Sequence, residues 1–307
     1  MNLREWALPL YTILTQLAIG ALFSLWIIRS VSSSKYGNEK MDQFTFVPVL
    51  IIFFTMILAI IGSHFHLSKP FLSFLAIRNF RYSWLSREVV FTGILFFLTG
   101  VLVVMLKFKK GYYHLKLGVG WGAILVGFAV IYSMASIYLL PTQISWNSHI
   151  AIISYYAVML LLGTTSLIVI LLMDLGFSGR ISPQDLDFRI QIIKKAVIWL
   201  TFTATVAAFI GIALSLYQIE LLRVLELPSA QASLKLILGL YKPLLVMRMG
   251  FTGFGVIWLI GVVIYFTRTQ RSFMKLLGPI YIACTLILIG EILQRFLFYA
   301  THVRTGL

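Results

Sequence analysis

The sequence carries few charged residues. Only 11% of its 307 residues are Asp, Glu, Lys or Arg, whereas about a quarter is usual for a soluble domain. Hydrophobic residues make up 60% of the protein, and polar residues gather in short islands between apolar runs of about 20 residues, the length that spans a bilayer. Because lipid offers no hydrogen bonds, each backbone polar group must be satisfied within its own helix. The composition therefore excludes a soluble globular domain and predicts an all-α integral membrane protein.

Cysteine and histidine are scarce as well. The single cysteine, Cys284, excludes an intrachain disulfide and a cysteine-ligated cluster held by this protein alone. A membrane b-haem normally needs two facing axial histidines, and two of the five histidines, His114 and His149, lie in or near loops. There is no Walker-type phosphate loop, no metal-ligand cluster and no hydrolase triad signature. We therefore expect no haem, no iron–sulfur cluster and no bound metal in this protein.

Hydropathy predicts a bundle of eight transmembrane helices. The spans are expected at about 6–29, 45–64, 86–106, 115–139, 148–173, 192–217, 244–267 and 276–301. An even number of spans places both termini on the same side of the membrane, and short connections favour one transmembrane domain over residues 1–307. Because the first apolar run is long enough to span, we expect no cleavable signal peptide.

Basic residues outnumber acidic ones, 25 to 10, giving a net charge of +15. They lie in loops that flank the spans, where lipid headgroups and topology explain them more simply than a nucleic-acid partner. The loops after spans one, three, five and seven hold slightly more Lys and Arg than the opposite side. The positive-inside rule then places both termini on the outer, periplasmic side of the cell inner membrane.

Two connections on the side of the termini are long. Residues 66–87 interleave aromatic residues with Lys69, Arg78, Arg81 and Arg87, a mixture typical of a segment at the level of the lipid headgroups. Residues 218–243 form the second connection and contain two prolines as breaks. Together the two connections are expected to form a basic platform for a partner protein.

The last span carries ionisable residues along one line. Glu291, Arg295, Tyr299 and His302 follow one another at steps of four, four and three, so they share one face of a helix. Ionisable groups inside a membrane are costly and mark candidate functional sites. A structural Glu291–Arg295 pair at i,i+4 is the alternative. Arg248, at the start of span seven, is a lone cation that needs a partner.

The stretch "GSHFHLSKP" (62–70) places His64 and His66 where the second span ends. Glu88 follows in what we expect to be the first turn of span three, with Ser83 or Ser86 as the N-cap. Each has an ordinary explanation: an interfacial histidine, or an acid that interacts well with the helix dipole. Together with nearby arginines, however, they describe a pocket that accepts protons, because histidine titrates near neutral pH.

Several of these stretches resemble the membrane-anchor subunits of dimethyl sulfoxide reductase, the DmsC family. The resemblance rests on "REWALPLYTILTQLAIGALF", on "HLSKPFLSFLAIRNFRYSWLSRE", on the arginine of span seven and on "GEILQRFLFYATH". It implies a haem-free subunit that binds and oxidises menaquinol and passes electrons to a ferredoxin-like iron–sulfur subunit. That subunit in turn supplies a molybdopterin catalytic subunit.

The resemblance also implies roles for single residues. His66 and Glu88 are the expected proton acceptors, and the quinol-binding set adds residues of the last two spans and of the basic connection: Arg81, Arg248, Glu291, Arg295 and His302. Lys69 replaces a residue that is often small in the family, His64 is an extra imidazole, and residues 100–240 match by hydropathy only. Two other functions stay open: a passive anchor, and a transporter with a path along Glu291, Arg295 and His302.

Overall fold

The computed structural model describes residues 3–65, 75, 77–177, 183–269, 277–301 and 303, and the regular structure in these ranges is helical throughout. Eight of the helices are long and apolar enough to cross a membrane. They are α1 (Leu3–Tyr36), α2 (Asn38–His64), α3 (Trp84–Phe108), α4 (Tyr113–Ser136), α5 (His149–Phe177), α6 (Pro183–Val224), α8 (Lys242–Thr269) and α9 (Leu277–Ala300). The all-α class and the eight spans predicted from hydropathy are confirmed.

Each predicted span overlaps one helix, but most helices extend beyond it. The largest difference is α6, expected over 192–217 and observed over 42 residues. At 1.5 Å per residue this helix is about 60 Å long, roughly twice the hydrocarbon thickness of a bilayer. Hydropathy marks only the part of a helix that lies in lipid, so it cannot detect such extensions.

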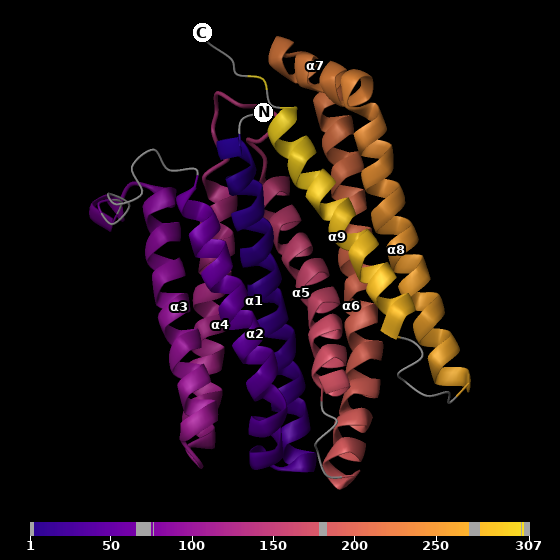
Figure 1. The fold of residues 1–307 in the computed structure, drawn as a ribbon. Coiled ribbons are helices and arrows are strands. Elements are labelled where there is room, and N and C mark those ends of the chain that lie inside the picture. Colours follow the sequence, from indigo (N-terminus) through magenta and orange to yellow (C-terminus); the bar gives the residue numbers. More distant parts are fainter. Residues whose placement is uncertain are drawn as a thin grey trace.

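The first and last spanning helices place both ends of the protein at one end of the bundle, which we call the terminal end (Figure 1). At the other end, which we call the opposite end, the backbone turns sharply between α1 and α2. Gly37 forms this turn with φ 85°, in the left-handed region that glycine adopts without strain. The two helices consequently form a tight antiparallel hairpin.

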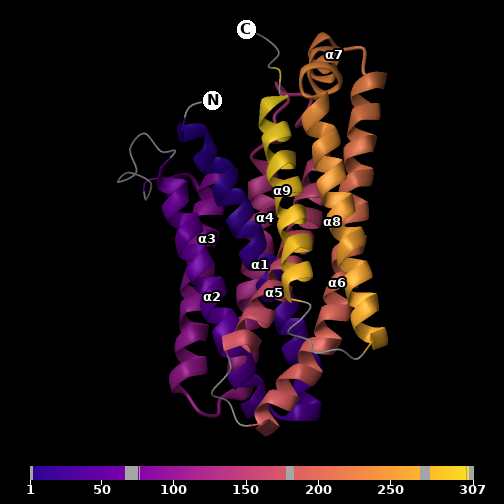
Figure 2. The ribbon, with the colours of Figure 1, turned by 45° about the vertical axis from the view of Figure 1, so that its right-hand side comes forward.

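Helices α1 and α5 lie at the centre and are the two most buried spans. As Figures 1 and 2 show, α2, α3 and α4 lie on one side of them and α6, α8 and α9 on the other. The backbones of α1 and α5 touch at Gly20 and Gly163, where an added Cβ would overlap the backbone of the facing helix. Small residues at such crossings are the usual means of close helix packing in membranes.

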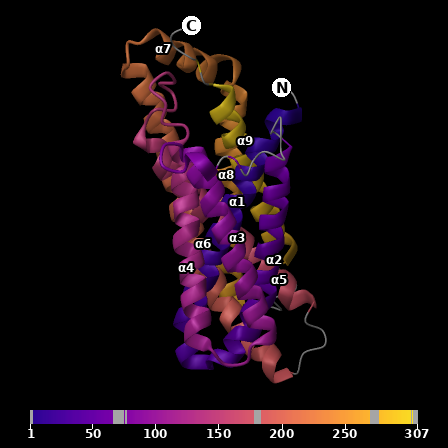
Figure 3. The ribbon, with the colours of Figure 1, turned by 90° about the vertical axis from the view of Figure 1, so that its left-hand side faces the viewer.

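The connection over residues 218–243 is mostly helical. It contains α7 (Pro228–Lys235) and a π-helical turn (Leu236–Leu240), which cross the terminal end beside α6 and α8 (Figure 3). Pro228 is the first residue of α7, and Pro243 lies in the first turn of α8. Both prolines therefore begin helices, where their missing N–H costs nothing, as well as ending the preceding segment.

Candidate functional site

Glu88 lies in the second turn of α3, because the helix begins at Trp84. Our placement of Glu88 in the first turn is therefore wrong, although Ser83 is the N-cap, with its Oγ 3.4 Å from the Ser86 nitrogen. The Glu88 side chain is buried, and its carboxyl group interacts with the nearby Tyr11 hydroxyl of α1. Tyr11 also shares a 3.2 Å hydrogen bond with Thr92, one turn further along α3. A helix-dipole role does not explain a carboxyl group held inside the bundle in this way.

Arg295 connects three helices at the same end. Its Nη2 donates to Oε1 of Gln16 over 2.7 Å, and the Gln16 amide donates to the Tyr155 carbonyl over 2.9 Å. The guanidinium lies 4.1 Å from the centre of the Tyr155 ring, a cation–π arrangement. No carboxylate among the described residues forms an ion pair with Arg295. Its positive charge is held by an amide and a ring face, which leaves it available to a ligand.

Aromatic side chains surround this arginine. The hydroxyls of Tyr138 and Tyr299 lie 2.7 Å apart, and Trp146 stacks on Phe298 with ring centroids 5.2 Å apart. Burial raises the pKa of Tyr138, in the α4–α5 connection, well above its ordinary value, and Tyr155, Tyr299 and Glu88 act in the same direction. The Tyr138 hydroxyl therefore stays protonated near neutral pH and can donate a hydrogen bond.

Glu88 lies within electrostatic range of three tyrosines of this aromatic group, Tyr138, Tyr155 and Tyr299, and we therefore treat the two groups as one candidate site. We call it the polar cluster and define it by eight residues: Tyr11, Gln16, Glu88, Thr92, Tyr138, Tyr155, Arg295 and Tyr299. They come from α1, α3, α5, α9 and the connection after α4. The cluster offers a carboxyl group, a guanidinium and several hydroxyls between flat apolar walls, which suits a planar ligand with oxygen atoms.

Glu291 belongs to a neighbouring pair. Its partner is Arg248 of α8, at 3.9 Å, rather than Arg295 one turn further along its own helix. Arg248 also donates to Ser215 Oγ over 2.9 Å, and Thr252 Oγ1 lies 3.4 Å from Glu291 Oε1. The lone cation of the sequence thus has its partner. Since these contacts join α6, α8 and α9, they support a role for Arg248 and Glu291 in helix packing.

The remaining predicted site residues lie at the surface or outside the described ranges. Arg81 is exposed, and its carbonyl accepts a 2.8 Å hydrogen bond from Arg87. His66 and His302 lie outside the described residues. His64, the last residue of α2, is exposed, with its Nδ1 2.7 Å from the Ile60 carbonyl oxygen.

A groove of about 780 Å³ lies toward the opposite end from the polar cluster, with Leu162 and Leu288 about two helical turns beyond Tyr155 and Arg295. It lies between α1, α2, α5 and α9, and its walls are mostly apolar. Leu17, Leu162 and Leu288 line the part nearest the polar cluster, while Thr285 and Cys284 line it further along. The apolar walls of this groove suit an apolar tail, and Leu17, Leu162 and Leu288 pack with Ile13 and Val158 at its end nearest the polar cluster.

Sequence reasoning missed most of the polar cluster. Gln16, an amide inside an apolar run, was detectable by the rule that polar groups in spans are candidates. Tyr11, Tyr138 and Tyr155 carry no such signal, because aromatic residues are common in spans and at membrane interfaces. Only the packing of α1 against α3, α5 and α9 reveals that their hydroxyls meet.

The fold and the polar cluster define a class: a multi-pass helical membrane protein with a buried polar site at one end. Residues 1–301 match the family described as DMSO reductase anchor subunit (DmsC), and the protein belongs to this family. It is 24% identical over 314 residues to the C subunit of the anaerobic dimethyl sulfoxide reductase of Haemophilus influenzae, with 100% of the present sequence and 99% of that subunit covered. Family membership gives the protein a membrane-anchor role in a DMSO-reductase complex.

Proposed function

We propose that this protein oxidises menaquinol in the polar cluster and passes the electrons to an iron–sulfur subunit of its complex. The observation that supports the proposal is that Glu88 and Arg295, which has no carboxylate partner among the described residues, both interact with Tyr155, beside a groove for an apolar tail. A quinol has a planar head with two hydroxyl groups and a long apolar tail, and the two parts of this site match the two parts of that molecule.

The chemistry assigns a task to each group. Oxidation of a quinol to a quinone releases two protons and two electrons, so the site must accept protons. The Glu88 carboxylate accepts one, with Tyr11 holding it in place. His66 accepts the second, as the family resemblance implies. The guanidinium of Arg295 stabilises negative charge on a quinol oxygen as its proton leaves, and the Tyr138–Tyr299 pair hydrogen-bonds the head.

The electrons must leave the protein. Among the described residues, no group of three or more His, Cys, Asp or Glu could hold a metal ion. We therefore place the iron–sulfur subunit, which supplies a molybdopterin catalytic subunit, against the terminal end, on the outer side of the inner membrane, where its path to the polar cluster is short. Helix α7 and its neighbours provide a surface there, with exposed Arg223, Lys235, Leu240 and Lys242.

Binding of a quinol-site inhibitor tests the head-group site. We expect Arg295→Gln to weaken binding at least about tenfold, because a charged hydrogen-bond donor is lost. The measurement is fluorescence titration of the intact complex in membranes, with Arg268→Gln, at an exposed arginine in the last turn of α8, as a matched control that keeps the wild-type affinity. Absence of binding to the wild-type complex contradicts the proposed function. Normal binding to Arg295→Gln contradicts only the role of Arg295.

Tail length tests the groove. Thr285→Trp places a bulky ring in the groove lining, so we expect the KM for a long-tailed quinol to rise about tenfold through overpacking. The KM for a short-tailed analogue should not change, because that molecule does not reach Thr285. Ile282→Trp, one turn away on the exposed surface of α9, is the control. Equal effects on both quinols contradict the placement of the tail.

A further inference from the structure

A second groove, separate from the proposed quinol site, lies between α1 and α6 near the opposite end. Its volume is about 480 Å³. Lys35 and Tyr36 of α1 and Lys195 of α6 line it together with the apolar Ile27, Val31 and Trp199. The groove therefore combines two cations with a long apolar wall.

The two lysines lie at the same end of this groove. Helices α1 and α6 run antiparallel, and the lining extends from Tyr36 to Ile27 on α1 and from Ile192 to Thr203 on α6. The end of the groove that Tyr36 lines on α1 is therefore the end that Ile192 lines on α6. Lys35 and Lys195 both fall within the first turn from that end. The remaining apolar wall extends about 12 Å further toward the middle of the bundle.

The charge at this end of the groove is uncompensated. In the part of the protein that the structure describes, neither Lys35 nor Lys195 forms an ion pair. The Lys35 ammonium lies 5.2 Å from the centre of the Tyr36 ring, and both lysine side chains are exposed. Further along, Val31 and Trp199 are 72% and 70% exposed. These exposed apolar residues face lipid tails when the helices stand in a membrane.

We propose that this groove binds one anionic phospholipid. The ammonium groups of Lys35 and Lys195 hold the phosphate and headgroup, and an acyl tail lies along Ile27, Val31 and Trp199. The two positive charges favour an anionic headgroup over a neutral one, because each lysine near the membrane surface adds its own attraction to anionic lipids. The apolar wall selects a lipid over a free phosphate ion. The proposal does not depend on quinol oxidation.

Lipid retention by the intact complex tests the proposal. Native mass spectrometry of the purified complex is carried out with added phosphatidylglycerol or with phosphatidylcholine of the same acyl composition. We expect the wild type to prefer phosphatidylglycerol, and Lys35→Gln/Lys195→Gln to bind it about 30-fold more weakly. Lys109→Gln/Lys110→Gln, which changes two lysines of the α3–α4 connection at the same end, should bind normally.

A charge-conserving variant, the quinol oxidation rate and inorganic phosphate serve as controls for the lipid measurement. Lys35→Arg/Lys195→Arg should retain the preference, since positive charge is conserved, and this variant separates loss of charge from disturbed folding. Quinol oxidation by all these variants should stay at the wild-type level. Equal retention of both lipids by the wild type, or undiminished binding of phosphatidylglycerol by the glutamine variant, overturns the proposal. Full displacement of the lipid by inorganic phosphate overturns the choice of a lipid as the ligand.

Discussion

Replacing Glu88 with glutamine is expected to lower quinol oxidation by the complex about 100-fold or more, the usual contribution of a positioned proton acceptor. Glutamine has nearly the same shape and can still accept a hydrogen bond from Tyr11, but it cannot take a proton. The complex should therefore assemble and bind a quinol-site inhibitor. The loss should fall mainly on kcat, with a smaller change in KM, because the substrate contacts remain.

The pH profile separates this role from a structural one. If Glu88 accepts a proton, wild-type activity falls at acidic pH as its carboxylate becomes protonated, and the glutamine variant loses that limb of the profile. Glu220→Gln is the matched control. Glu220 lies on α6 at the same terminal end of the bundle, but it is exposed and pairs with Arg223 at 3.0 Å. Wild-type kcat in the Glu88→Gln complex, with an unchanged pH profile, contradicts the assignment.

The spans were predictable because lipid sets both their length and their composition. The partners of the buried ionisable groups were not. For Glu291, the spacing rule on one helix favours Arg295, yet the structure forms the helix-to-helix contact with Arg248 of α8 instead. The same applies to Glu88, whose partner Tyr11 lies 77 positions earlier in the sequence. Sequence patterns report neighbours along a helix, whereas these contacts depend on which helix faces which.

Charge counting has a related weakness. It counts Arg29, Lys116 and Arg189 among the charges near the span ends that set topology, but the structure places all three in ion pairs, with Arg29 and Lys116 buried. Asp42 is the acidic partner in two of these ion pairs, those of Arg29 and Lys116. It precedes the predicted span 45–64, so hydropathy assigns it to a loop, whereas α2 begins at Asn38, directly after the turn at Gly37. The longer helix carries Asp42 into the protein interior.

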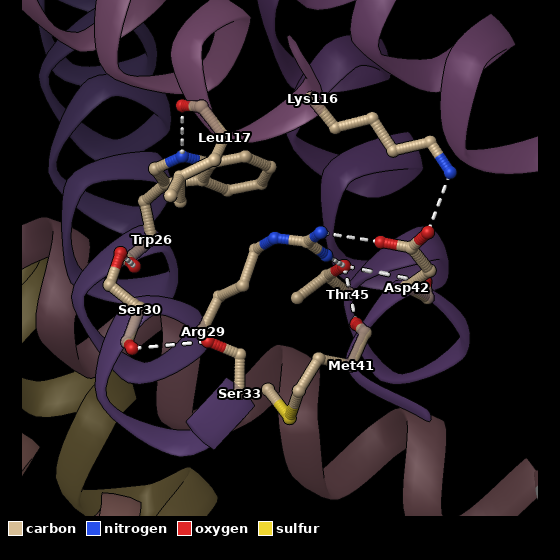
Figure 4. A network of polar contacts seen from close by, with 9 residues as sticks. All are labelled: Trp26, Arg29, Ser30, Ser33, Met41, Asp42, Thr45, Lys116 and Leu117. Atoms are coloured by element: carbon tan, nitrogen blue, oxygen red, sulfur yellow. Dashed lines mark hydrogen bonds and ion pairs between the residues drawn. The ribbon is translucent and has the colours of Figure 1, made fainter. Parts of the chain in front are cut away.

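The arrangement around Asp42 joins three helices at the opposite end (Figure 4). Its carboxylate accepts ion pairs from Arg29 of α1 at 2.5 Å and from Lys116 of α4 at 2.6 Å. Arg29 also donates to Thr45 Oγ1 over 3.1 Å. The side chains of Arg29 and Lys116 are only 2% and 1% exposed. One acid therefore compensates two buried cations.

Replacing Asp42 with asparagine is consequently expected to lower the free energy of unfolding by about 3–5 kcal/mol, because both cations remain buried without a counter-charge. Adding Lys116→Met should recover part of the loss by removing one of them. Asp174→Asn, which breaks the ion pair with the more exposed Arg189, is the control and should cost less. Unfolding of the purified complex in a denaturing detergent measures each change.

Since the polar cluster lies at the terminal end, the folded Asp42→Asn complex should still oxidise quinol. Unchanged stability of this variant would show that water or lipid compensates the two cations.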